Sequence, residues 1–101
     1  MSSPEPHEVR LSRAAAREFQ RLPDRDRATI RRALKRLAVA VSTTGERGGK
    51  SSKSIRGVSD SFHRLRVGDL RVMYDVLAEE RVILVLGIVN RRDLERWLRS
   101  R

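Results

Sequence analysis

The sequence predicts an α+β fold: two N-terminal helices packed on one face of an antiparallel sheet of about four strands, followed by a short C-terminal helix. Apolar residues recur at helical spacing in the N-terminal half, whereas residues 63–89 alternate or run apolar as strands do. Helices that precede a run of strands are typical of α+β domains. With 101 residues the chain is expected to form one domain over 1–101, in which residues 1–7, polar and with two prolines, are disordered.

Two helices are predicted near the N-terminus. Ser12 is a typical N-cap for a helix over residues 13–22. Pro23 suits the start of a second helix over residues 24–41, because proline is tolerated where no backbone donor is needed. The second helix has the clearer apolar stripe, formed by Ile30, Ala33, Leu34, Leu37, Ala38 and Val41.

The remaining regular segments are mostly strands. Gly68-Asp69 and Glu79-Glu80 are expected to form tight turns, and residues 42–54, rich in Gly, Ser and Thr, a loop. A continuously apolar strand is predicted after the second turn and is expected to be covered on both faces. The predicted strands cover residues 8–11, 55–58, 63–67, 70–76 and 82–89, and a last helix covers 93–99.

The charge balance favours a polyanionic partner. The chain has 23 Lys and Arg against 13 Asp and Glu, for a formal charge of +10. All but Lys35, Lys50 and Lys53 of the basic residues are Arg, whose planar fork can engage two phosphate oxygens at once. Codon usage in a GC-rich genome could explain the ratio of Arg to Lys, but it does not explain the net charge.

Several classes of function are disfavoured by composition. The chain has no Cys, which excludes disulfides, thiol nucleophiles and Cys-ligated metals, and its only His residues are His7 and His63. No P-loop, nucleophile elbow or HExxH motif is present, so neither a metal nor another cofactor is expected. The longest apolar run, residues 82–89, is too short to span a bilayer, and no signal sequence follows Met1, so the expected location is the cytoplasm.

The segment FHRLRVGDLRVMYD, residues 62–75, is the most informative for function. In a strand, Arg64 and Arg66 point to the face opposite His63, and the following turn brings Arg71 onto the same face as the other two arginines. Three guanidiniums on one face form a cationic patch the size of a phosphate group. The alternative is an ordinary solvated strand face whose arginines pair with Asp60, Asp69 or Asp75.

Three ring-bearing residues could act in packing or in function. The strand parity of His63 places it on the core side, although it is the only central group that titrates near neutral pH. Tyr74 shares the core-side parity of its strand. Trp97 is expected to dock the last helix, with base stacking as the alternative.

The segments LSRAAAREFQRLP, SIRGVSDSFHRLRVGDLRVMYDV and VILVLGIVNRRDLERW resemble the RelE/ParE superfamily of bacterial type II toxins, over about residues 8–98. The resemblance implies a small α+β toxin wrapped by a cognate antitoxin. Members of the RelE-like branch, which we favour for this chain, cleave mRNA in the ribosomal A site without a metal. ParE-like members instead inhibit DNA gyrase.

The resemblance also implies roles for individual residues. The RelE-like site uses basic residues on the central strands and a C-terminal tyrosine, whereas this chain has no tyrosine after Tyr74 and has Trp97 near that place. Arginine stabilises phosphorane charge well but is a poor proton shuttle, which leaves His63 as the protein candidate for a proton role. The predicted catalytic residues are Arg64, Arg66, Arg71, Arg91 and His63, and the predicted RNA-binding residues are Lys50, Lys53, Arg56, Arg92 and Trp97.

Three functional hypotheses follow. The first is a toxin that acts as a metal-free endoribonuclease on ribosome-bound mRNA and so inhibits translation, with a cognate antitoxin as its partner. The second is a gyrase inhibitor without nuclease activity. The third is a basic RNA-binding module, which the scarcity of aromatic residues for base stacking disfavours.

Overall fold

The structure is a computed structural model, and it describes residues 5–44, 53–54 and 62–100. Lys50, Arg56 and the predicted strand over 55–58 lie outside these residues. The elements, in chain order, are β1 Glu8–Leu11, α1 Arg13–Gln20, α2 Asp24–Thr44, β2 Lys53–Ser54, β3 His63–Val67, β4 Leu70–Leu77, β5 Val82–Asn90, the 3₁₀ helix η1 Arg91–Asp93 and α3 Leu94–Arg99.

The predicted α+β class is confirmed, but the sheet is mixed and not wholly antiparallel. Its five strands lie in the order β1-β5-β4-β3-β2, and β1 runs parallel to β5 while the other pairs are antiparallel. Local turn signals specify only strands that follow one another along the chain. The pairing of β1 with β5, whose Glu8 lies opposite Val82, joins segments too distant in sequence for those signals.

The helices start as predicted and differ at their ends. The Ser12 side chain accepts a hydrogen bond from the Ala15 backbone N–H at 3.1 Å, which confirms the N-cap. Helix α2 continues past the predicted end at Val41, and inside this extension the Ser42 hydroxyl donates to the Val39 carbonyl at 3.0 Å. No glycine or proline lies between Pro23 and Gly45 in the sequence to stop the helix earlier.

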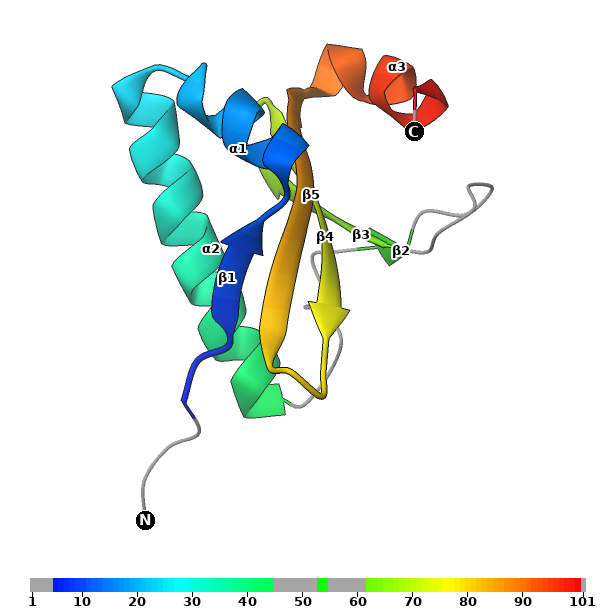
Figure 1. Cartoon of the computed structure of the whole chain (residues 1–101). Helices are drawn as coiled ribbons and strands as arrows, with labels where there is room; N and C mark the ends of the chain where they lie inside the picture. Colours follow the sequence, from blue (N-terminus) through cyan, green and yellow to red (C-terminus); the bar gives the residue numbers. More distant parts are fainter. Residues whose placement is uncertain (1–4, 45–52, 55–61, 101) are drawn as a thin grey trace.

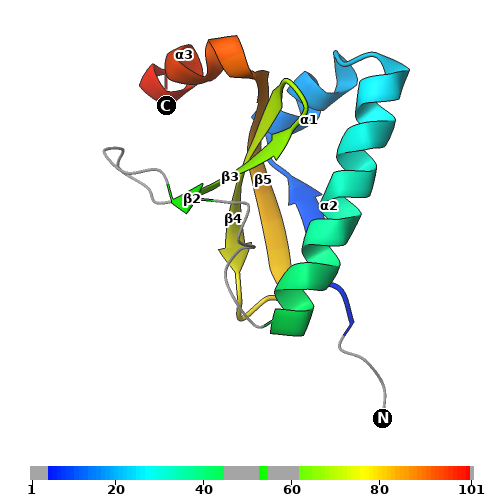
Figure 2. The same ribbon diagram turned by 180° about the vertical axis from the view of Figure 1, so that it is seen from behind.

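Helices α1 and α2 lie on one side of the sheet, and α3 lies on the other (Figures 1 and 2). The core between the sheet and α1 and α2 uses alternate residues of β4 and β5 together with the apolar stripe of α2. Its buried members are Ala15, Ile30, Ala33, Leu34, Leu37, Ala38, Val41, Leu65, Val72, Tyr74, Val76, Ile83, Val85 and Ile88. The predicted core stripe of α2 is thus confirmed.

Strand β5 contains a β-bulge that changes which face its side chains occupy. Opposite Met73 and Tyr74 of β4, the register passes from Gly87 directly to Val85, so Leu86 is the extra residue. As a result Val85 and Ile88, three residues apart, both face the core, and Gly87 faces the α3 side together with Met73.

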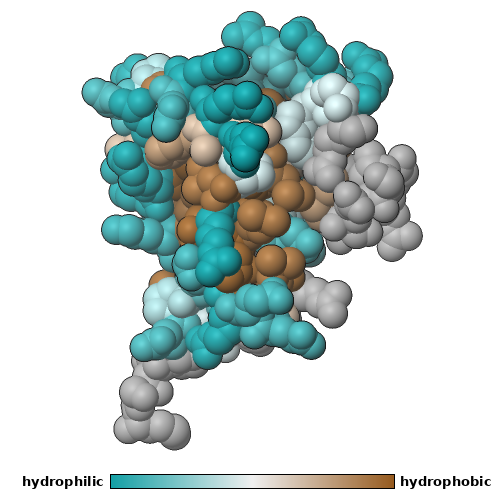
Figure 3. Space-filling model, viewed as in Figure 1, coloured by the Kyte–Doolittle hydropathy of each residue, from teal (hydrophilic) through white to brown (hydrophobic). Residues whose placement is uncertain are grey.

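One face of the molecule carries an apolar patch over part of the sheet. Figure 3 shows apolar side chains gathered over the β5 region, with hydrophilic residues around them. The half-buried Leu84 and Leu86 show that β5 is not fully covered along its length, unlike the expectation for its continuous apolar sequence. Among the helices of the described residues, none has the length and hydropathy that crossing a membrane requires.

Candidate functional site

The β3–β4 hairpin places three arginines on the face of the sheet that points away from α2. Gly68, at a φ of +59°, supplies the left-handed residue of the tight turn. Arg66 lies directly opposite Arg71 in the register, and Arg64 lies opposite Met73. Directly opposed residues point to the same face, so the predicted common face of Arg64, Arg66 and Arg71 is confirmed.

The start of η1 brings a fourth arginine to the same end of the sheet. The Arg91 backbone N–H donates to the Asp69 carbonyl at 2.8 Å, and the Arg91 Nε lies 3.7 Å from the Asp69 Oδ1. The Asn90 side chain accepts from the Arg92 N–H at 3.1 Å and so caps η1. The turn after β3 and the end of β5 are therefore held together, and they carry Arg91 beside the hairpin.

Arg71 is the buried member of the group. Only 8% of the residue is exposed, and its NH1 group donates to the carbonyls of Gly68 at 2.9 Å and Leu70 at 2.8 Å. Burial is the main cause that lowers the pKa of Arg71, and repulsion from Arg66, Arg64 and Arg91 lowers it further, while Asp69 opposes the shift. The Arg71 side chain thus stabilises the turn through these two hydrogen bonds.

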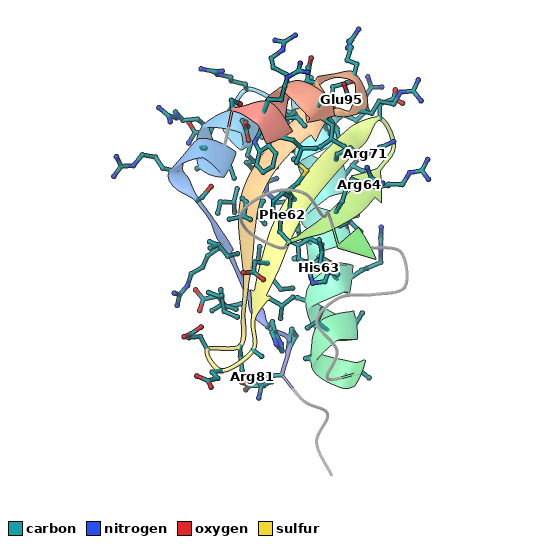
Figure 4. The ribbon with its side chains drawn as sticks, turned by 90° about the vertical axis from the view of Figure 1, so that its right-hand side faces the viewer. Phe62, His63, Arg64, Arg71, Arg81 and Glu95 are labelled. Carbon is teal, nitrogen blue, oxygen red and sulfur yellow. The ribbon has the colours of Figure 1, made fainter. Side chains whose placement is uncertain are left out.

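We call Arg64, Arg66, Arg71 and Arg91 the arginine face (Figure 4 labels Arg64 and Arg71). Like charges directly opposed on a sheet are destabilising, so the opposition of Arg66 and Arg71 has a cost that a bound anion would remove. Arg66 and Arg91 are exposed and Arg64 is half-buried, so three guanidiniums are open to a ligand. The geometry suits a phosphate group held by several forks.

His63 does not join the arginine face. It lies opposite Tyr74 in the register and stacks on the tyrosine ring, with 5.2 Å between ring centroids and 29° between planes. Tyr74 belongs to the core beneath α2, so the predicted core-side position of His63 and of Tyr74 is confirmed. The sheet itself separates the imidazole from Arg64, its neighbour in sequence.

Trp97 docks α3 on the sheet, as its helical position predicts. Its ring meets Phe62 edge-on at 5.6 Å between centroids and lies directly over Gly87. A Cβ atom at position 87 would come within 2.4–2.5 Å of the indole, so only glycine fits there. Glycine within an apolar strand often marks such a close approach, and this was the available sequence signal for Gly87.

The other predicted RNA-binding residues are less fully placed. The backbone of Lys53 lies opposite Arg64 in the β2–β3 register, and Arg92 is exposed next to Arg91. Lys50 and Arg56 are outside the described residues. Within the described ranges, His, Asp and Glu side chains do not gather in groups of three or more that could hold a metal ion.

Several solved structures have the same architecture. The chain is similar to the toxin-antitoxin complex RelBE2 from Mycobacterium tuberculosis, with 22% identity and a TM-score of 0.68 over 87% of this chain and 94% of that chain. It is also similar to a free mutant form of the E. coli toxin RelE, with 21% identity and a TM-score of 0.64 over 92% of each chain. The archaeal RelE-RelB complex from Pyrococcus horikoshii matches with 23% identity and a TM-score of 0.59 over 86% of this chain and 97% of that chain. These likenesses establish a shared fold.

The sequence comparison identifies the family. Among curated protein sequences, none matches this chain. The family model described as the ParE toxin of the type II toxin-antitoxin system parDE matches residues 9–95, which is most of the chain and includes the whole arginine face. The protein therefore belongs to the ParE toxin family of type II toxin-antitoxin systems, within the RelE/ParE superfamily.

Proposed function

We propose that this toxin inhibits translation in the cytoplasm by cleaving mRNA on the ribosome, and that the arginine face binds the scissile phosphate. The observation that carries the proposal is the convergence of four arginines, from β3, β4 and η1, beside the Asp69 carboxylate, which pairs with Arg91. A face of this kind supports recognition of the RNA backbone, since phosphate contacts dominate nucleic-acid binding.

The proposed reaction is attack of a ribose 2′-oxygen on the adjacent phosphorus. The new P–O2′ bond forms as the P–O5′ bond breaks, which gives a 2′,3′-cyclic phosphate and a 5′-hydroxyl. The 2′-hydroxyl loses a proton and the leaving 5′-oxygen gains one. Negative charge gathers on the phosphoryl oxygens in the transition state, and preorganised cations near those oxygens lower the barrier.

The solvent exposure of each arginine decides its proposed role in this reaction. Arg64, Arg66 and Arg91 reach solvent and would contact the phosphate. Arg71 is buried, stabilises the turn between β3 and β4, and adds its positive charge to the site. His63 is on the other side of the sheet, so we assign proton transfer to water and to groups of the ribosome. Lys50, Lys53, Arg56 and Arg92 would extend the basic surface along the RNA, and Trp97 would act by holding α3 in place.

A cognate antitoxin is the proposed partner that keeps the toxin inactive. The matched family is defined by toxin-antitoxin pairs, and the similar structures from M. tuberculosis and P. horikoshii are complexes of RelE with RelB. With a net charge of +10, this chain would favour an acidic antitoxin.

The test replaces the half-buried Arg64 and the exposed Arg66 and leaves the buried Arg71 intact. Arg64→Gln with Arg66→Gln should reduce growth arrest and mRNA cleavage by about a hundredfold or more, because transition-state contacts of this kind contribute several kcal/mol. Primer extension on mRNA after induction measures cleavage directly. Arg25→Gln with Arg32→Gln, two exposed positions on α2, removes the same charge and is the matched control. Undiminished cleavage by the first variant would exclude the arginine face as the site.

Gyrase inhibition is the second candidate, and two observations favour it. The matching family model describes ParE, and the His63 imidazole lies on the face of the sheet opposite the arginines, where it cannot transfer a proton at the phosphate site. Purified toxin added to DNA gyrase in a supercoiling assay should then inhibit the enzyme, and induction should cause DNA damage with intact mRNA. Either result, together with the absence of cut mRNA, would replace our first proposal.

A further inference from the structure

A small pocket lies at the end of the molecule where the turn between β3 and β4 meets the start of α2 (Figures 1 and 2). Asp26 and Thr29 from α2, residues 67–70 of the hairpin and Asn90 from the end of β5 line it, and none of these residues is basic in a chain with a charge of +10. Its volume of about 260 Å³ is below the range of about 300–1,000 Å³ that is usual for drug-sized ligands, so it suits a single small ring system.

One wall of this pocket is the turn that adjoins the arginine face. Gly68 and Leu70 line the pocket, and their carbonyls accept hydrogen bonds from the NH1 group of Arg71 at 2.9 and 2.8 Å. Asp69 lines it as well, and the Asp69 Oδ1 lies 3.7 Å from the Arg91 Nε. Because a single ribose joins a base to its phosphate, one nucleotide could place its phosphate on the arginines and its base in the pocket.

The pocket offers both hydrogen-bond acceptors and donors. Asp26 is half-buried, and its carboxylate forms no ion pair with the basic side chains that the structure describes. Its place in the first turn of α2 suits the helix dipole, which leaves its oxygens able to accept further hydrogen bonds. The Asn90 Oδ1 accepts from the Arg92 N–H at 3.1 Å, and this cap of η1 does not use the two N–H donors of the Asn90 Nδ2 group.

Guanine is the nucleobase whose edge matches these groups. Its N1–H and N2–H groups are neighbouring donors that one carboxylate can bind together, and its O6 acceptor lies beside them. Adenine and cytosine present a donor next to a ring nitrogen that accepts, which a carboxylate would repel, and uracil has its donor between two acceptors. Unstacked RNA bases are commonly recognised along this edge.

We propose that this pocket binds the guanine of a nucleotide whose phosphate lies on the arginine face, with Asp26 accepting from N1–H and N2–H and Asn90 donating to O6. Val67 and Leu70, both half-buried, supply apolar surface for the flat ring. The inference rests on the proposed cleavage of mRNA, and it adds a preference for guanosine next to the scissile phosphate.

The experiment titrates guanosine and adenosine monophosphates, each as the 3′ and the 5′ isomer, into the purified full-length toxin and follows backbone amide signals by NMR. The better guanosine isomer should shift the signals of Gly68 and Asn90 and bind with a Kd about tenfold lower than the same adenosine isomer, since a bidentate contact discriminates between bases by that factor or more. Asp26→Asn should reduce the difference to less than about twofold. Asp24→Asn removes the same charge from the same helical turn outside the pocket, so this matched control should keep the difference.

A second variant tests the donor. Asn90→Asp keeps a side-chain oxygen that can cap η1, but it replaces the Nδ2 donors with an oxygen that repels guanine O6 and accepts from adenine N6. The preference of this variant should therefore pass from guanosine to adenosine. Equal Kd values for guanosine and adenosine in the unmodified toxin, or an unchanged preference in both pocket variants, would overturn the proposal.

Primer extension in cells separates this proposal from the nuclease proposal. Cuts next to guanosine that move toward adenosine in the Asn90→Asp toxin would support both. Selective binding of guanosine monophosphate together with uncut mRNA would support the pocket and contradict the nuclease. Cleavage without base preference, together with equal Kd values, would contradict the pocket alone.

Discussion

At the scale of single residues, Gly87 is a position where the structure leaves no room for a side chain. Its neighbours on the α3 side are Met73 and the indole of Trp97, and the bulge at Leu86 is what turns it to that side. Trp97 in turn meets Phe62, so one missing Cβ allows two aromatic rings to pack on the sheet and to anchor α3. The same anchor sets where the chain after Arg91 can lie.

Gly87→Ala should therefore destabilise the protein by about 1–3 kcal/mol, because the new methyl overlaps the indole and something must move. Urea unfolding measures the free energy, and Trp97 fluorescence reports whether the ring has become solvated. The double variant with Trp97→Ala serves as the control, since removing the indole removes the overlap and the two effects should not add. Strict additivity would show that the contact does not limit position 87.

At the scale of elements, the β3–β4 hairpin combines structural and functional demands. Its turn needs Gly68 in the left-handed region, and its strands oppose Arg66 and Arg71. The Arg71 guanidinium offsets part of this repulsion by donating to the carbonyls of Gly68 and Leu70. A buried guanidinium whose NH1 group binds its own turn thus keeps the neighbouring arginines in a fixed arrangement.

Arg71→Lys keeps the charge but replaces the longer side chain whose NH1 group donates to both carbonyls, so we expect a loss of about 1–3 kcal/mol in the free energy of unfolding. Thermal unfolding followed by circular dichroism measures it. Arg64→Lys, a half-buried position on the adjacent strand, should cost less than about 0.5 kcal/mol. Equal changes for the two variants would mean that Arg71 does not brace the turn.

At the scale of the whole molecule, the charge of +10 makes stability dependent on anions. Most basic side chains are dispersed, but the arginine face concentrates four of them at one end of the sheet. General screening by salt acts on all of the charges, whereas a multivalent anion that binds at one place acts chiefly there. The two effects can be separated at constant ionic strength.

Replacing chloride with phosphate at constant ionic strength should raise the Tm by several degrees, because a ligand present at about 100 times its Kd stabilises the folded state by about 2.7 kcal/mol. Differential scanning fluorimetry measures the shift. The double variant Arg64→Gln with Arg66→Gln should lose most of it. If both proteins shift equally, phosphate acts on the overall charge and not at the arginine face.

Much of the fold could be predicted from local patterns. The apolar stripe of α2, the Ser12 cap and the Gly68-Asp69 turn all depend on residues close in sequence, and each was found where predicted. The strand alternation also placed Arg64, Arg66 and Arg71 on one face and His63 on the other. Arg91 was found only through the family resemblance, since no local pattern relates it to a hairpin twenty residues earlier.

Other features depended on contacts between distant segments. The parallel pairing of β1 with β5, the bulge at Leu86 and the burial of Arg71 arise when separate elements pack, and no short window of sequence contains both partners. The residue types and their periodicity thus specified the helices and strands and the positive charge of the candidate site. Packing decided which arginines are exposed and which one is buried against the turn, because burial and strand order are properties of the assembled layers.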